Sequence, residues 1–374
     1  MDSRDWDVFC RVIDNYGDAG VCWRLCRDLA QRGQRVRLWI DDAAPLHWMS
    51  LPEQREAVQV RRWEEADACF EAAPAGVVIE AFGCELPDAV KARMAIAVPP
   101  PQWINLEYLS AEAYVERSHG LRSPQWQGPA AGLEKYFFYP GFTRKTGGLL
   151  REPGLIASLE AIHPQQWLVQ HGIQHQAGER LVSLFCYENP ALPRLLQGLA
   201  AQRTLILACP GPGSRMLAAL EAQKAIPAGL RVQHLPFLPQ DDYDRLLSAC
   251  DLNLVRGEDS FVRAQWAARP FIWHIYPQQD GAHEAKLEAF MQLAFAGMDA
   301  SQRTAWRDLW RDWNQLAPGS DDAAALRVPP LEAAASAFQH WRAELLTQVD
   351  LVTQLQVFLR RSAGPLQPAK ASSS

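Results

Sequence analysis

The sequence lacks the features that would place it on nucleic acid or in a membrane. It has no long block of lysine or arginine, and its formal net charge of -6 gives no basic field for a polyanion. It also has no run of about 18 apolar residues that could cross a bilayer. The opening residues, MDSRDWDVFCRVID, contain acids and no apolar stretch of signal-peptide length. We therefore expect a cytoplasmic protein with no direct nucleic-acid partner and no membrane contact.

Signatures of metals, disulfides and dinucleotides are also missing. The eight cysteines are scattered without a C-x-x-C pair, and most lie in apolar runs typical of buried, reduced thiols. Cys22 and Cys26 share a helical face, but no third and fourth ligand accompany them, so we expect them to pack. In the H-x-x-x-H pattern of His171 and His175 the zincin glutamate is absent, so zinc is not expected. The absence of G-x-G-x-x-G disfavours a dinucleotide oxidoreductase.

What is present begins with a strand, a glycine-containing turn and a helix. Val8–Ile13 predicts the strand, residues 21–30 recur at helical spacing, and residues 36–40 predict the next strand. This is a Rossmann-type βαβ unit. Asp14 and Asp18 fall at the carboxyl end of its first strand, where open α/β sheets place their ligand sites. Either these acids serve a site, or Asp18 caps the helix and Asp14 bonds its own turn.

The remainder of the first half is less regular. Residues 41–75 predict loops and short helices, and strands are expected at 77–82 and 102–105. Residues 121–145 are too rich in proline, glycine and other turn residues for regular structure. We expect this stretch to be an aromatic loop, either at the mouth of a cleft or packed on its own rings.

A second α/β series determines the domain organisation, because the pattern loosens near residues 163–180 and then resumes. Strands are predicted at 181–187, 204–209, 230–235, 251–255 and 271–275. We predict an N-terminal Rossmann-like domain at 1–170 and a C-terminal Rossmann-like domain at 178–344. A last helix, roughly Trp341–Arg361, should complete the first domain with its part from about 345 to 361. Residues 362–374 are predicted to be a disordered tail.

Three acids at the start of one predicted helix resemble a metal-binding pattern. Asp241, Asp242 and Asp244 form a D-x-D-like run of the kind that chelates metal in some glycosyltransferases. The run immediately precedes an apolar helical segment that ends at Cys250. We therefore predict that these acids cap the helix.

The most informative stretch is Asp251–Phe290, which predicts a strand, a tight turn, a helix, a strand and a second polar turn at 278–283. The first turn comprises Arg256, Gly257, Glu258, Asp259 and Ser260. Free backbone N-H groups at a helix start can hold a phosphate without a metal, although Asp259 or Ser260 could merely cap the helix. Two such turns side by side favour a ligand site. Because Glu258 and Asp259 would repel a diphosphate alone, the ligand should also offer hydroxyl donors, which points to a nucleotide-sugar.

Two sequence blocks carry a family resemblance. The predicted organisation resembles the GT-B glycosyltransferase fold, which has two Rossmann-like domains, a nucleotide site in the second domain and a terminal helix that crosses back to the first. CRVIDNYGDAGVCWRLCRDLA at Cys10–Ala30 and RGEDSFVRAQWAARPFIWHIYPQQDGAHEAKLEAF at Arg256–Phe290 resemble signature blocks of the bacterial protein-arginine rhamnosyltransferases that modify translation elongation factor P. The resemblance runs from about Trp6 to Arg361. One departure is Ala268, where the family pattern leads us to expect glycine in a helix-end turn.

The resemblance implies an inverting, metal-independent transfer of rhamnose from dTDP-β-L-rhamnose to an arginine nitrogen in the N-terminal domain of elongation factor P, with no cofactor. By position, Asp14 and Asp18 match the essential acids of that family. From the chemistry of a guanidinium acceptor we expect Asp18 to be the base and Asp14 to orient the acceptor, and Glu258 could share in these roles. The donor-binding residues that the resemblance implies are Phe185, Tyr187, Phe237, Gln240, Arg256, Glu258, Asp259 and Ser260. The alternatives are a GT-B enzyme with another nucleotide-sugar or a small-molecule acceptor, and a non-enzymatic nucleotide-sugar-binding regulator.

Overall fold

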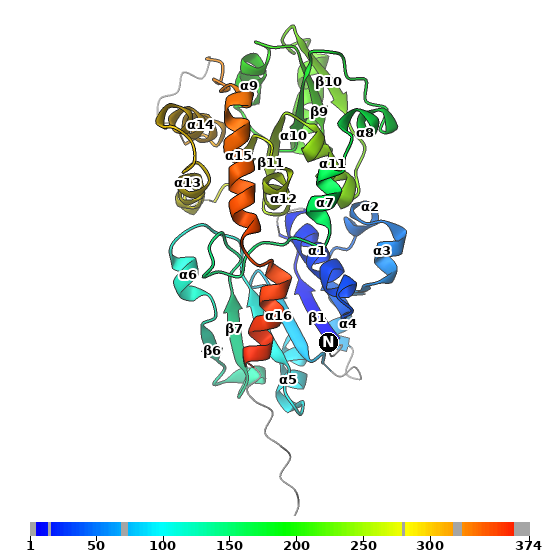
Figure 1. The fold of residues 1–374 in the computed structure, drawn as a ribbon. Helices are drawn as coiled ribbons and strands as arrows, with labels where there is room; N and C mark the ends of the chain where they lie inside the picture. The colour runs from blue at the N-terminus through cyan, green and yellow to red at the C-terminus, as the bar shows by residue number, and fades with distance from the viewer. Residues whose placement is uncertain (1–4, 14–15, 69–73, 279–280, 317–323, 363–374) are drawn as a thin grey trace, which may run out of the picture.

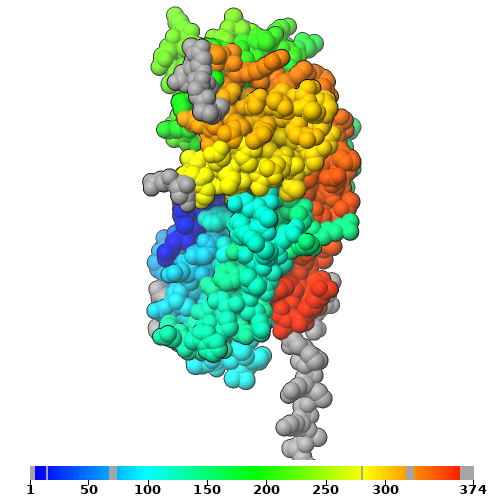
Figure 2. Space-filling model, turned by 90° about the vertical axis from the view of Figure 1, so that its left-hand side faces the viewer, coloured from blue at the N-terminus to red at the C-terminus, as the bar shows by residue number. Residues whose placement is uncertain are grey.

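The protein consists of two α/β domains stacked end to end, as the computed structural model in Figure 1 shows. The structure describes residues 5–13, 16–68, 74–278, 281–316 and 324–362. Asp14, Cys69 and the predicted tail from 363 onward lie outside the described residues. In the space-filling view of Figure 2 the two domains meet along a broad band, and the red C-terminal helix lies against the lower, first domain. No described helix is long and apolar enough to cross a membrane.

The first domain is built on a seven-stranded sheet of order β3-β2-β1-β4-β5-β7-β6. Its strands are β1 (Asp5–Cys10), β2 (Arg35–Ile40), β3 (Gln59–Arg62), β4 (Val77–Ala81), β5 (Gln102–Leu106), β6 (Arg122–Pro124) and β7 (Glu134–Phe138). All neighbouring strands are parallel except β6, which runs antiparallel to β7. The strand order reverses beside β1, so the loop after β1 opens at a switch point, where ligands bind in such sheets.

Two expectations for this domain were wrong. Residues 121–145 form β6 and β7 rather than a loop without regular structure, and residues 41–75 include the strand β3. β7 pairs with β5, and its Phe138 is fully buried. Pairing with β5 and burial of the Phe138 ring therefore outweigh the local preference of this segment for turns.

Helices cover both sheets. In the first domain they are α1 (Gly17–Gln31), α2 (Leu46–Met49), α3 (Pro52–Glu56), α4 (Glu65–Ala68), α5 (Asp88–Ile96), α6 (Tyr114–Ser118) and the 3-10 turn η1 (Gly128–Ala130). The connection to the second domain carries α7 (Leu155–Glu160) and α8 (Pro164–Gln170). α1 is buried along most of its length because it packs between its own sheet and the second domain.

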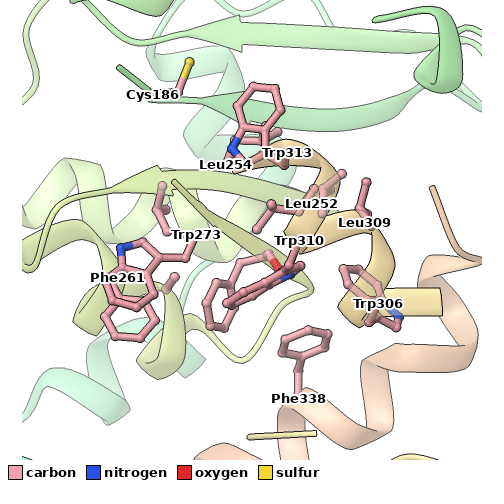
Figure 3. Packing of buried hydrophobic residues seen from close by; sticks show 14 of the residues in the cluster. Cys186, Leu252, Leu254, Phe261, Trp273, Trp306, Leu309, Trp310, Trp313 and Phe338 are labelled. Atoms are coloured by element: carbon pink, nitrogen blue, oxygen red, sulfur yellow. The ribbon is translucent and has the colours of Figure 1, made fainter. Parts of the chain in front are cut away.

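The second domain has a five-stranded, all-parallel sheet of order β10-β9-β8-β11-β12. Its strands are β8 (Arg180–Leu184), β9 (Thr204–Ala208), β10 (Leu230–His234), β11 (Leu252–Arg256) and β12 (Phe271–His274). Its helices are α9 (Leu192–Leu199), α10 (Pro212–Ala222), α11 (Gln240–Ala249), α12 (Asp259–Ala267), α13 (Ala282–Ala294) and α14 (Ala300–Trp313). Figure 3 shows how Trp306, Trp310 and Phe338 pack beneath β11, giving this domain an aromatic core.

The C-terminal segment is two helices rather than one. α15 (Leu331–Leu346) packs on the second domain and α16 (Leu351–Ser362) on the first. The break lies at Asp350, whose carboxylate accepts from the backbone N-H of Thr353 at 2.9 Å, as a helix-starting residue does. The terminal helix that crosses back to the first domain, as expected of a GT-B fold, is confirmed. The prediction of one continuous helix from Trp341 is wrong, because the chain leaves α15 and Asp350 caps the start of a second helix, α16.

Ala268 ends α12 in the left-handed conformation, at φ 54°. A β-carbon strains this conformation and glycine does not. We expect Ala268→Gly to raise the free energy of unfolding by roughly 0.5 to 1 kcal/mol, measured by urea denaturation. Ala267→Gly, one residue earlier and inside the helix, is the control and should lower it by about 1 kcal/mol. Destabilisation of equal size by both variants would contradict strain at position 268.

Candidate active site

A cavity open to solvent lies between the two domains, at the carboxyl ends of their sheets. Its wall combines residues of the first domain with the turn after β11. The residues that line it are Tyr16, Gly17, Trp48, Met49, Phe185, Tyr187, Cys209, Pro210, Pro236, Phe237, Leu238, Gln240, Tyr243, Arg256, Gly257, Asp259 and Ser260. The structure thus brings together seven of the eight residues predicted to bind the donor. Glu258, the eighth, lies beside the cavity rather than on its wall.

Arg256 forms the cationic end of the cavity. Its guanidinium carbon lies 4.3 Å from the centre of the Phe185 ring and 4.8 Å from that of Tyr187. The residue is 4% exposed, and its Nη1 donates to the carbonyl of Cys186 at 3.5 Å. No salt bridge joins it to a carboxylate within the described residues, so its charge is available to an anionic ligand. The side-chain hydroxyl of Ser260 is used inside the turn: it accepts from the N-H of Arg256 at 2.9 Å and donates to the Arg256 carbonyl at 2.5 Å.

Asp259 holds the donor turn against α1. Its Oδ1 accepts from Nε of Arg24 at 2.7 Å, and its Oδ2 accepts from Nε2 of Gln240 at 3.3 Å. Gln240 also donates to the carbonyl of Gly20 at 3.0 Å. A β-carbon on Gly20 would lie 3.0 Å from the Asp259 carboxylate, so glycine permits this close approach. Asp259 therefore joins the two domains, a role that sequence reasoning did not include.

Asp18 lies in the first turn of α1 and is 3% exposed. Its carboxylate accepts from the backbone N-H of Ile13 at 2.8 Å and from the hydroxyl of Tyr108 at 3.4 Å. The Tyr108 ring stacks on Phe82, with centroids 4.5 Å apart. Asp14, the other predicted catalytic acid, lies outside the described residues.

Glu258 faces the same region from the second domain. Its Oε2 accepts from the backbone N-H of Leu109 at 2.9 Å. Burial is the largest influence on this carboxyl and raises its pKa to about 7; Lys286 acts in the opposite sense, and the negative charge of Asp18 raises the pKa further. Consecutive residues, Tyr108 and Leu109, therefore bind Asp18, the expected base, and Glu258, which could share in its role.

The raised pKa of Glu258 predicts a pH effect on stability. In the unfolded chain a glutamate ionises near pH 4.3, whereas the folded protein keeps Glu258 protonated up to about pH 7. The contribution of neutral Glu258 to the free energy of unfolding is fully present below the pKa of the unfolded chain. It is lost as the pH rises through the pKa of the folded protein. We expect Glu258→Gln to gain unfolding free energy relative to the unmodified protein as pH rises from 5 to 8, in urea titrations. A difference that is independent of pH would contradict the raised pKa.

The D-x-D-like acids do not cap α11, so that prediction was wrong. Pro239 occupies the N-cap, and the carboxylates are taken by arginines instead. Asp241 pairs with Arg27 at 3.1 Å, and Asp244 accepts from both Arg24 and Arg263. Asp242 pairs with Arg245 on α11 itself, whereas Asp241 and Asp244 join α11 to α1, a non-local role that local sequence cannot reveal.

The other candidate ligands fall outside the cavity. Within the described part of the chain, no group of three or more His, Cys, Asp or Glu side chains is arranged to hold a metal ion. Cys22 and Cys26 are buried free thiols, as expected. Of the second polar turn the structure describes Gln278 and residues 281–283, and none of these lines the cavity.

Sequence reasoning missed the residues that the first domain contributes to the site. Tyr16 and Trp48 line the cavity, Tyr108 contacts Asp18, and Arg24 binds Asp259. The aromatic side chains carry no local signal, since tyrosine and tryptophan at such positions are more often core residues. Their exposure at the domain boundary becomes visible only once the two sheets are placed together.

A family model matches residues 6–360 of the chain, and its description is elongation factor P (EF-P) rhamnosyltransferase. Proteins described as protein-arginine rhamnosyltransferases are similar over most of their length. The Pseudomonas aeruginosa protein is 48% identical over 340 residues, which cover 83% of this chain and 86% of the relative. The Shewanella oneidensis protein is 37% identical over 407 aligned positions, covering 96% and 98%.

Solved structures agree with the sequence comparison. A structure described as the structural basis for EarP-mediated arginine glycosylation of translation elongation factor EF-P superposes with a TM-score of 0.65 at 33% identity, covering 96% of this chain and all of that one. CalG4, the calicheamicin glycosyltransferase, superposes with a TM-score of 0.54 at 14% identity and covers 98% of this chain and all of its own. The latter likeness concerns the fold alone, which is the GT-B fold.

Proposed function

Since this chain belongs to the EF-P rhamnosyltransferase family, and is therefore a protein-arginine rhamnosyltransferase, we propose that it transfers rhamnose from dTDP-β-L-rhamnose to an arginine in the N-terminal domain of EF-P. We further propose that the transfer inverts the anomeric configuration and requires no metal. Family membership makes the protein an enzyme, which disfavours the alternative of a non-enzymatic regulator.

The observation that carries the proposal is the meeting of two carboxylates from different domains beside a cationic cavity. Asp18 of the first domain and Glu258 of the second are bound to Tyr108 and Leu109 respectively. Arg256 lies in the adjacent cavity wall. An acceptor cation placed between Asp18 and Glu258 would favour the ionised form of Glu258. It would also be next to a donor diphosphate held at Arg256, so the nucleophile and the leaving group would meet in one cleft.

The acceptor determines what the carboxylates must do. A guanidinium has a pKa above about 12 and no free lone pair, so an ordinary carboxylate cannot deprotonate it before attack. Proton loss must accompany formation of the bond between nitrogen and the sugar C1. One carboxylate can hold the planar fork by charge-assisted hydrogen bonds while the other receives the proton. We assign the proton to Asp18, with Asp14 orienting the guanidinium and Glu258 sharing in its binding.

The leaving group is stabilised from the opposite side. The bond from C1 to the diphosphate oxygen breaks as the new bond forms, and the electron pair departs with dTDP. The guanidinium of Arg256 and the N-terminal N-H groups of α12 can stabilise the negative charge that develops there. These groups supply the stabilisation for which other transferases use a divalent cation. Direct displacement with a base on the acceptor side inverts the configuration at C1.

A donor panel tests the proposal. Purified EF-P is incubated with this enzyme and either dTDP-β-L-rhamnose, dTDP-glucose, UDP-glucose or GDP-mannose, each with and without EDTA. We expect transfer from dTDP-β-L-rhamnose alone, unaffected by EDTA, and an α-linked product by NMR. Preferential transfer from another donor, abolition by EDTA, or a β-linked product would each refute the corresponding part of the proposal.

A further inference from the structure

The donor cavity has an aromatic wall that belongs to the first domain. Trp48 on α2 and Tyr16 just before α1 line the cavity, and Phe237 of the second domain lies against them. The ring centroids of Trp48 and Phe237 are 4.5 Å apart, and those of Tyr16 and Trp48 are 5.1 Å apart. Three rings from both domains therefore make one continuous wall, which we call the aromatic wall.

The two ends of the cavity differ in chemistry. The inner rings, Phe185 and Tyr187, lie on the guanidinium of Arg256, so that end suits a diphosphate. The aromatic wall runs from Tyr16, whose ring centre lies 5.9 Å from the guanidinium carbon of Arg256, to Phe237 at the outer end, where 45% of Phe237 is exposed to solvent. A ring left open to solvent in a cavity favours stacking by a planar ligand group.

The segment that carries Trp48 is held by contacts of its neighbours. Leu46 and Met49, two positions before and one position after Trp48, are buried, and the Ser50 hydroxyl donates to the Leu46 carbonyl at 2.6 Å. The following helix, α3, is joined to α11 because Nε2 of Gln54 donates to Oδ2 of Asp241 at 2.7 Å. The aromatic wall is thus preorganised, which limits the entropy lost when a ligand stacks on it.

We propose that Trp48 is a donor-binding residue that, with Phe237, receives the nucleobase of the nucleotide-sugar. The inference rests on the proposed nucleotide-sugar donor and extends it, since it gives the first domain a part in holding the donor. A nucleobase at the aromatic wall, with its diphosphate at Arg256, spans the cavity from its outer to its inner end.

The test compares ligands with and without a base. Binding of dTDP and of dTDP-β-L-rhamnose is measured by calorimetry for the unmodified protein, Trp48→Ala and Trp48→Phe. Inorganic pyrophosphate, which has no base, is measured as an inhibitor of transfer. We expect Trp48→Ala to lower the affinity for dTDP by roughly 5- to 150-fold, the factor for one base-aromatic stack. Inhibition by pyrophosphate should be unchanged. Trp48→Phe should restore most of the affinity, and kcat at saturating donor should stay near that of the unmodified protein.

Trp126→Ala is the matched control, because this tryptophan of the first domain is 83% exposed and is absent from the cavity wall. It should bind dTDP normally. The inference is overturned if the affinity of Trp48→Ala for dTDP is within twofold of that of the unmodified protein. It is also overturned if dTDP binding and pyrophosphate inhibition weaken by the same factor, which would indicate a structural role. Failure of the unmodified protein to bind dTDP would instead overturn the proposed donor, so the two failures are distinguishable.

Discussion

Asp18→Asn is expected to reduce rhamnosyl transfer by on the order of 10²- to 10⁴-fold, the usual contribution of a positioned general base. Asparagine has nearly the shape of aspartate and can still accept the hydrogen bond from the backbone N-H of Ile13. It cannot take the proton that the guanidinium must lose. Affinity for dTDP should be unchanged, because Asp18 is not on the cavity wall. Rates of EF-P modification and dTDP calorimetry on the same preparation separate the two effects.

Asp41→Asn is the matched control for this result. Asp41 follows β2, at the same edge of the sheet, and its carboxylate accepts from the backbone N-H of Val12 at 2.9 Å. The variant therefore changes the charge of a carboxylate that binds the same loop, without touching the proposed base. It should keep transfer within a few fold of the unmodified enzyme. Retained turnover in Asp18→Asn, or equal losses in both variants, would refute Asp18 as the base.

Arg24→Met is expected to lower the free energy of unfolding by about 3 to 5 kcal/mol, the cost of removing one partner from a buried ion pair. Arg24 is 1% exposed and contacts Asp244, Glu152 and Asp259 at 3.0, 3.3 and 2.7 Å. Without it, Glu152 and Asp244 would keep only the guanidinium of Arg263, and Asp259 would lose its arginine partner. The effect is measured by urea denaturation.

Arg35→Met provides the comparison for Arg24→Met. The Arg35 side chain is 75% exposed and pairs with Asp5 at the surface. Exposed pairs contribute about 0 to 1 kcal/mol because water screens them. If Arg24→Met cost no more than Arg35→Met, the buried charge cluster would not hold the domains together as the structure indicates.

The sequence was sufficient where a feature depends on local pattern. The strand, turn and helix around Arg256 and Ser260 follow from hydrophobic spacing, as does the series of strands in the second domain. The order of the predicted elements also located Asp18 correctly, at the start of the helix that follows the first strand. Such features depend on residues within a few positions of one another, so they can be predicted without knowing the rest of the fold.

Features that depend on distant partners could not be predicted. Arg24 and Asp259 are 235 residues apart in sequence, and either could have been a surface charge. The strand at Glu134–Phe138 exists because β5 lies beside it, and Trp48 reaches the cavity only because the second domain closes that side. The donor turn was therefore recognisable, whereas the bonds that fasten it to α1 were not.

The most direct test of the central claim is the intact mass of EF-P after incubation with this enzyme and dTDP-β-L-rhamnose. Peptide fragmentation then locates the modification, and an EF-P variant with lysine in place of the modified arginine serves as the acceptor control. The account predicts a gain of one deoxyhexose on a single arginine of the N-terminal domain and no gain on the lysine variant. No gain in mass, or a deoxyhexose on any residue other than arginine, would contradict it.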